Sequence, residues 1–146
     1  MPGPGSRSGR PQRGALHHVE LWVPDLARAG AEWGWLLGEL GYAQFQDWPH
    51  GRSWRLGDTY LVVEQSPALT AASQDRCRPG LNHLAFHAGD QARVDALAAS
   101  APAHGWTALF ADRYPFAGGP DHYAAYLANT DEFEVELVAG PAAVRG

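Results

Sequence analysis

The first half of the chain shows a sequence of hydrophobic patterns that predicts one strand, one helix and three further strands. Apolar and polar residues alternate over 16–23, which is typical of a strand with one buried face. After Asp25, apolar residues return every three or four positions, which predicts a helix that begins at this N-cap and ends at Gly41. Short apolar runs between Gly-containing or polar turns predict strands over 43–47, 53–56 and 60–64.

The second half repeats this plan. A strand is predicted over 82–88, then a helix that begins after Asp90 and ends at Gly105, then strands over 107–112, 122–127 and 134–138. His18 and His83 lie 65 residues apart, as do Asp25 and Asp90. The closing strands, 60–64 and 132–136, superpose at an offset of 72, and a longer loop over 113–121 accommodates the extra residues.

An internal duplication of this kind predicts an α+β fold of two βαβββ modules, 15–79 and 80–141, that form a mixed-sheet cleft. Residues 1–14, rich in Gly, Pro, Ser and Arg, are predicted to form a flexible N-terminal tail, and 142–146 a short C-terminal tail.

Composition narrows the classes of partner. The formal net charge is −5 and the predicted modules carry no Lys/Arg cluster, so a nucleic-acid partner is not expected. The sequence has no apolar run of membrane-spanning length and no signal-peptide core, which favours a cytoplasmic protein without a membrane partner. Cys77 is the only cysteine, so an intrachain disulfide is excluded.

Two histidines and two glutamates occupy matched places in the duplicated plan. His18 and His83 lie in the first strand of each module, and Glu64 and Glu136 lie in the last. Because side chains alternate across a strand, all four are expected on the face opposite the helices. A single His or Glu is more often structural or solvated, but the matched set predicts a site for one divalent ion: Zn, Ni, Co, Mn or Fe(II).

Aromatic and histidine side chains on the same strands are candidates for a substrate pocket around this metal. His122 and Tyr126 share strand parity, so both are expected to face the cleft while Tyr123 points away. The full set of pocket candidates is Trp22, Trp48, His50, Trp54, Tyr60, His87, His122 and Tyr126.

With these motifs in order, the chain resembles the vicinal oxygen chelate superfamily of glyoxalase I, fosfomycin-resistance proteins, extradiol dioxygenases and bleomycin-binding proteins. The resemblance lies in residues 16–26, 37–42, 62–64, 80–86 and 126–138. It implies that His18, Glu64, His83 and Glu136 are the metal ligands, in the pattern of glyoxalase I. Where bacterial glyoxalase I has a glutathione-binding Arg and Asn, this chain has Trp22 and Ala68.

The resemblance leaves three functions open. The first is a glyoxalase-like lyase or isomerase for a small substrate chelated through neighbouring oxygens, with Glu64 or Glu136 as the catalytic base. The second is an Fe(II) or Mn(II) extradiol-type dioxygenase that uses His18, His83 and Glu136. The third is a non-catalytic, bleomycin-resistance-like drug-binding protein. The modules can pair within one chain or between chains, and a homodimer is expected because two small modules expose sheet edges.

Overall fold

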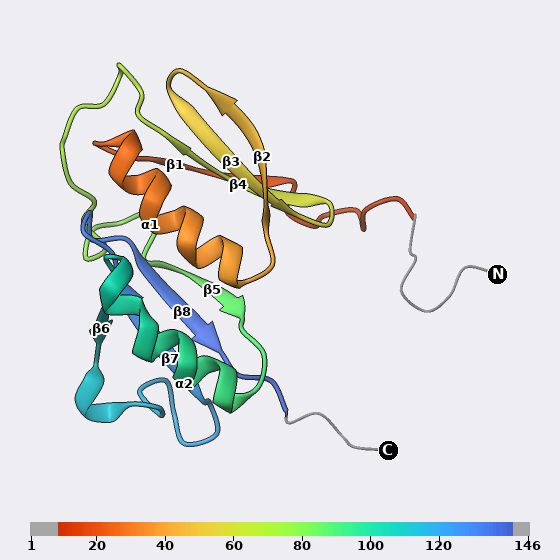
Figure 1. Cartoon of the computed structure of the whole chain (residues 1–146), viewed down its shortest axis with the longest axis vertical. Coiled ribbons are helices and arrows are strands. Elements are labelled where there is room, and N and C mark those ends of the chain that lie inside the picture. The colour runs from red at the N-terminus through yellow and green to blue at the C-terminus, as the bar shows by residue number, and fades with distance from the viewer. Residues whose placement is uncertain (1–8, 142–146) are drawn as a thin grey trace.

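The computed structural model describes residues 9–141 and contains the two predicted βαβββ modules (Figure 1). The first module consists of β1 (His18–Trp22), α1 (Leu26–Glu39), β2 (Ala43–Trp48), β3 (Gly51–Leu56) and β4 (Thr59–Glu64). The second consists of β5 (His83–His87), α2 (Gln91–Ser100), β6 (Thr107–Leu109), β7 (Ala124–Ala128) and β8 (Glu134–Val138). The predicted C-terminal tail and most of the predicted N-terminal tail lie outside the described residues.

The two helices begin where the sequence predicts. The side chain of Asp25 accepts a hydrogen bond from the backbone N–H of Arg28 at 3.0 Å, and that of Asp90 accepts one from Arg93 at 2.9 Å. These bonds satisfy N–H groups that a helix leaves free in its first turn. The second module departs from the prediction after Leu109, because Phe110 adopts a positive φ of 55° and a short 3₁₀ turn, Ala111–Arg113, replaces the rest of the strand.

Each module has one mixed four-stranded sheet. The strand orders are β1-β4-β3-β2 and β5-β8-β7-β6, and the two lists match module for module. In each sheet the first and last strands of the module pair in parallel, and the other pairs are antiparallel. One face of each sheet packs on the helix of its own module, and the opposite face is open.

One continuous hydrophobic core joins the modules through their helices. Trp33 of α1 packs edge-to-face on Trp106 with ring centroids 5.0 Å apart, and the Trp106 indole N–H donates to the backbone oxygen of Glu32. The Thr130 hydroxyl, in the β7–β8 turn, donates to the Glu32 carboxylate at 2.5 Å. These contacts fix the first helix against the second module.

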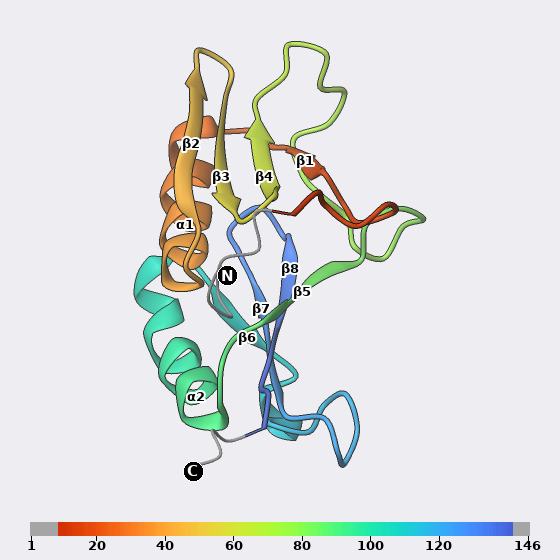
Figure 2. The same ribbon diagram turned by 90° about the vertical axis from the view of Figure 1, so that its right-hand side faces the viewer.

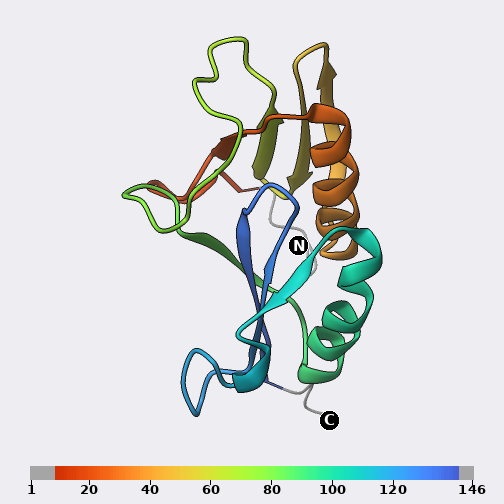
Figure 3. The same ribbon diagram turned by 90° about the vertical axis from the view of Figure 1, so that its left-hand side faces the viewer.

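This packing decides which way the two open sheet faces point. Figures 2 and 3 show both helices on one side of the molecule and both sheets on the other. The open faces therefore do not face each other within one chain. Within residues 9–141, no helix combines the length and apolar character needed to cross a membrane.

Candidate functional site

The open face of the second sheet carries a buried carboxylate between two imidazoles. Glu136 of β8 is 6% exposed, and its Oε1 lies 3.1 Å from Nε2 of His83 on β5. Its other oxygen, Oε2, forms a hydrogen bond with Nε2 of His122, which lies two residues before β7. Tyr126 lies opposite Glu136 in the strand register, and burial, followed by the Glu136 charge, raises the pKa of this tyrosine. His122 and Tyr126 therefore share the open face of the second sheet, as strand parity predicts, and Tyr123 points away from it toward Asp95.

The tautomer of His83 is set by a side chain from the preceding loop. The Asn82 amide donates through Nδ2 to the backbone oxygen of Arg76 at 2.9 Å, so its Oδ1 faces Nδ1 of His83 at 2.7 Å. Because Oδ1 can only accept, Nδ1 of His83 carries a proton. A neutral His83 then presents the lone pair of Nε2 to the Glu136 carboxylate, and these two acceptors can be this close only with a proton or a cation between them.

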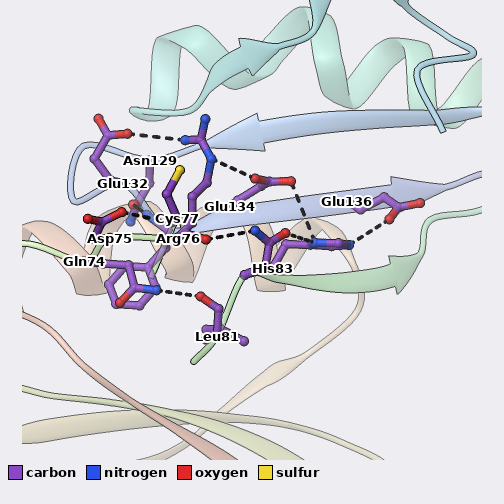
Figure 4. Close-up of polar contacts among 12 residues, drawn as sticks. Gln74, Asp75, Arg76, Cys77, Leu81, His83, Asn129, Glu132, Glu134 and Glu136 are labelled. Atoms are coloured by element: carbon purple, nitrogen blue, oxygen red, sulfur yellow. Dashed lines mark hydrogen bonds and ion pairs between the residues drawn. The ribbon is translucent and has the colours of Figure 1, made fainter. Parts of the chain in front are cut away.

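A second buried carboxylate on the same face is balanced by an arginine. The Arg76 guanidinium, from the loop between the modules, lies 3.0 Å from Oε1 of Glu134 and 3.6 Å from Oε2 of Glu132 (Figure 4). Glu136, two residues farther along β8, has the imidazoles of His83 and His122 as its partners instead. The two neighbouring carboxylates therefore serve different purposes: Glu134 anchors the loop, and Glu136 is free to share its charge with the two histidines.

The open face of the first sheet presents the other predicted histidine. His18 stacks on Tyr60 of β4 with ring centroids 4.8 Å apart. His18, Tyr60, Trp48 and Val62 line a depression of about 410 Å³. A neighbouring cavity of about 330 Å³ lies between Trp22 and the loop over 68–74.

The structure contradicts the predicted superposition of the closing strands. His18 pairs in register with Tyr60, whereas His83 pairs with Glu134, so the two closing strands correspond at an offset of 74 rather than 72. The counterpart of Glu136 in the first module is therefore Val62, and that of Glu64 is Val138.

Glu64 consequently lies far from the histidine it was expected to join. Glu64 pairs in register with Trp22, which lies four residues beyond His18 on β1. Four residues of a strand span about 13 Å. Since both residues belong to one module, no pairing of modules changes this separation. The predicted four-ligand set does not converge.

The remaining predicted ligands form two separate half-sites. His18 lies on one open face, and His83 and Glu136 lie on the other. Within residues 9–141, no three His, Cys, Asp or Glu side chains are arranged to hold a metal ion. The donor chemistry of the second half-site nevertheless fits a divalent ion, because a His with Nδ1 held by an acceptor and Nε2 beside a carboxylate is the usual form of a ligating imidazole.

The pocket candidates divide between these surfaces and other places. Trp48 and Tyr60 lie beside His18, Trp22 lines its own cavity, and His122 and Tyr126 contact or face Glu136. The prediction was wrong for Trp54, which is buried in the core against α1 at Gly34. His50 lies in the β2–β3 turn beside Pro49 and Gln65, and His87 is exposed at the end of β5.

Sequence reasoning assigned no site role to Asn82 or Arg76. Both belong to the loop between the modules, where no periodicity marks a residue as facing the site. The one available signal was the position of Asn82, directly before the predicted ligand His83.

Comparison with known proteins gives consistent matches over most of the chain. The family model described as Glyoxalase/Bleomycin resistance protein/Dioxygenase superfamily matches residues 17–126. The uncharacterized protein YqjT of Bacillus subtilis (strain 168) is 46% identical over 125 residues, which cover 85% of this chain and 98% of that protein. The crystal structure of a glyoxalase-like protein from Bacillus halodurans shares 46% identity with a TM-score of 0.83, covering 88% of this chain and 97% of that one.

A more distant match shows the same fold in a metal-bound protein. The fosfomycin resistance protein FosX from Listeria monocytogenes, solved with Mn(II) and sulfate, is 17% identical with a TM-score of 0.59, and the match covers 88% of this chain and 93% of that one.

Proposed function

Because the chain belongs to the glyoxalase/bleomycin resistance protein/dioxygenase superfamily, we propose that it is a metal-dependent, glyoxalase-like lyase or isomerase. Its substrate is a small molecule that chelates the metal through two neighbouring oxygens. The metal is a divalent ion held by His18, His83 and Glu136.

The observation that carries this proposal is the arrangement of His83. Its Nδ1 proton is committed to Asn82, and its Nε2 lies 3.1 Å from Oε1 of Glu136. This separation matches that of two neighbouring ligands around an ion with bonds of about 2.1 Å. The proposal is also supported, less specifically, by FosX, which shares this fold and was solved with Mn(II).

The third ligand comes from a second copy of the chain in this proposal. The shared core holds the two open faces in one direction, so His18 cannot approach His83 of its own chain without breaking the contacts of α1. Both faces also expose aromatic rings, including Phe45 beside Tyr60 in the first module and Phe110 beside Tyr126 in the second. A homodimer in which the first module of each chain covers the second module of the other would bury these rings and bring His18 to Glu136.

Glu136 is the candidate catalytic base. Bound metal would supply Lewis-acid stabilisation of negative charge on the substrate oxygens. The Glu136 carboxylate lies on the open face beside that position, where its Oε1 would leave the metal as it accepts a proton from a substrate carbon. The register removes Glu64 from this role, because Glu64 lies about 13 Å from the position of His18 along the strands.

The same register favours a second candidate function. With Val62 in place of a second carboxylate, the set becomes two histidines and one carboxylate, the arrangement that non-haem Fe(II) oxygenases use with open positions for substrate and dioxygen. An extradiol-type dioxygenase is therefore the alternative.

One pair of assays separates these functions. Protein purified without chelators is analysed for metals and loaded with Mn(II), Ni(II), Co(II), Zn(II) or Fe(II). Isomerisation of α-ketoaldehyde thiol adducts without oxygen uptake supports the lyase or isomerase, whereas oxygen uptake with catechols supports the dioxygenase. Protein that binds none of these ions contradicts both, and leaves the drug-binding function.

A further inference from the structure

His122 reaches the site from a segment that the internal repeat does not explain. In the first module, β2 and β3 are joined by the turn Pro49-His50, whereas the corresponding strands β6 and β7 are joined by a loop over 110–123. His122 stands at the end of this loop, and its Nε2 bonds Oε2 of Glu136. His83 meets the other oxygen, Oε1.

The loop is shaped to hold the His122 ring in place. A Cβ at Gly118 would lie 2.7 Å from Cδ2 of His122 and 2.5 Å from the hydroxyl of Tyr126. The loop backbone therefore passes close to both rings, and any larger residue at Gly118 would displace one of them. The backbone N–H of His122 also donates to the oxygen of Gly119 at 3.2 Å. The imidazole is confined by the loop on one side and by the carboxylate on the other.

From this geometry we infer that His122 is a positioning residue for Glu136. It holds Oε2, so that Oε1 stays beside Nε2 of His83 as the single oxygen offered to the metal. The inference rests on the proposed function, because its expected consequence is that Glu136 binds the metal more tightly. Hydrogen bonds to a ligating carboxylate fix its orientation, and their loss typically weakens metal binding 10- to 100-fold.

The first test measures Mn(II) affinity by electron paramagnetic resonance. H122A is expected to bind Mn(II) about 10- to 100-fold more weakly. H122Q is expected to recover most of this loss, because its amide N–H₂ can donate to the same oxygen. H87A, on the same strand face as His83 but at the end of β5, is the matched control and should keep wild-type affinity.

A spectroscopic readout distinguishes positioning from direct ligation. If His122 only positions Glu136, the visible spectrum of Co(II)-loaded H122Q should indicate the same number of metal ligands as in the wild type. A changed ligand number without rescue by Gln would make His122 a ligand and overturn the inference. Equal Mn(II) affinity in wild type and H122A would also overturn it.

Crystal structures of H122A and the wild type give a second test, which does not depend on whether the protein binds metal. The distance between Oε1 of Glu136 and Nε2 of His83, 3.1 Å here, is expected to lengthen beyond hydrogen-bonding reach in the variant. Should the wild type bind no divalent ion, the proposed function fails, and this distance still decides whether His122 positions the carboxylate. An unmoved Glu136 contradicts the inference.

Discussion

Val62 and Glu136 occupy equivalent positions in the two modules: each lies on the closing strand, two residues beyond the partner of the first-strand histidine. The duplicated fold therefore carries a carboxylate at this position in one module and a buried aliphatic side chain in the other. The proposed metal set is consequently asymmetric, with one ligand from the first module and two from the second.

The asymmetry predicts different effects for two chemically identical substitutions. E136Q should abolish Mn(II) binding or weaken it by at least about 100-fold, because it removes a charged ligand. E64Q should change the affinity by less than about twofold, because Glu64 lies about 13 Å from the position of His18 along the strands. Isothermal titration of both variants with Mn(II) checks this, and a large loss in E64Q would restore the four-ligand interpretation.

The role assigned to Asn82 predicts a loss of affinity without loss of a ligand. N82A removes the acceptor that holds the Nδ1 proton of His83, so the ring can turn or change tautomer. We expect Mn(II) to bind about 10- to 100-fold more weakly while the metal-to-protein ratio at saturation is unchanged. N82D keeps an acceptor for Nδ1 of His83 but loses the N–H that donates to the Arg76 oxygen, so it should bind Mn(II) more tightly than N82A. Equal affinities in N82A and wild type would disprove the orienting role.

Trp54 is predicted to matter for stability and not for ligand binding. Its ring is 6% exposed and packs against α1 at Gly34. Urea unfolding of W54A should show a free energy of unfolding lower by about 3–5 kcal/mol. W48A, which changes a ring on the open face beside His18, should cost less than W54A. The reverse order would mean that Trp54 is not a core residue.

A cluster on the far side of the second module predicts a pH dependence of the 110–123 loop. The Tyr114 and Tyr123 hydroxyls donate to Asp95 of α2, and these hydrogen bonds lower the pKa of Asp95 below its usual 3.8. A lowered pKa in the folded state means that the ionised carboxylate stabilises the loop above pH 3.8, and that this stabilisation is lost as the pH falls through the folded pKa.

Hydrogen exchange of residues 110–123 tests this dependence. Protection is expected to fall on acidification below pH 3.8 in the wild type. D95N should show reduced protection already at neutral pH, with a weaker acid dependence. Identical exchange in D95N and wild type would show that the cluster does not hold the loop.

The module plan was predictable from sequence because it rests on periodicity. Helix and strand periods, the N-caps Asp25 and Asp90, and the duplicated order of elements all agree with the structure. The placement of His83 and Glu136 on one open face also follows from strand alternation.

The register of β4 was missed for a physical reason. Strand alternation has a period of two, so a slip by two residues keeps every side chain on its predicted face and leaves no trace in the hydrophobic pattern. Glu64 and Val62 both point away from α1, and only the paired positions tell them apart. Pro67 and Pro141 each follow a closing strand. Their separation of 74 residues equals the offset that the strand pairing shows.

Periodicity could not predict the roles of the loop residues or the direction in which the open sheet faces point. His122, Asn82 and Arg76 act through contacts between segments distant in sequence, and loops have no repeating pattern that marks such contacts. The packing of α1 on the second module depends on Trp33 and Trp106, which periodicity identifies only as core residues.

A metal site shared between two copies of the chain can be restored by mixing two variants that each lack one histidine ligand. H18A and H83A homodimers should each bind no Mn(II) at concentrations that saturate the wild type. A mixture refolded together in equal amounts should recover about a quarter of the wild-type metal, because half of the dimers are mixed and each mixed dimer has one intact pair of half-sites. No recovery, in a mixture shown to contain mixed dimers, would contradict the shared site.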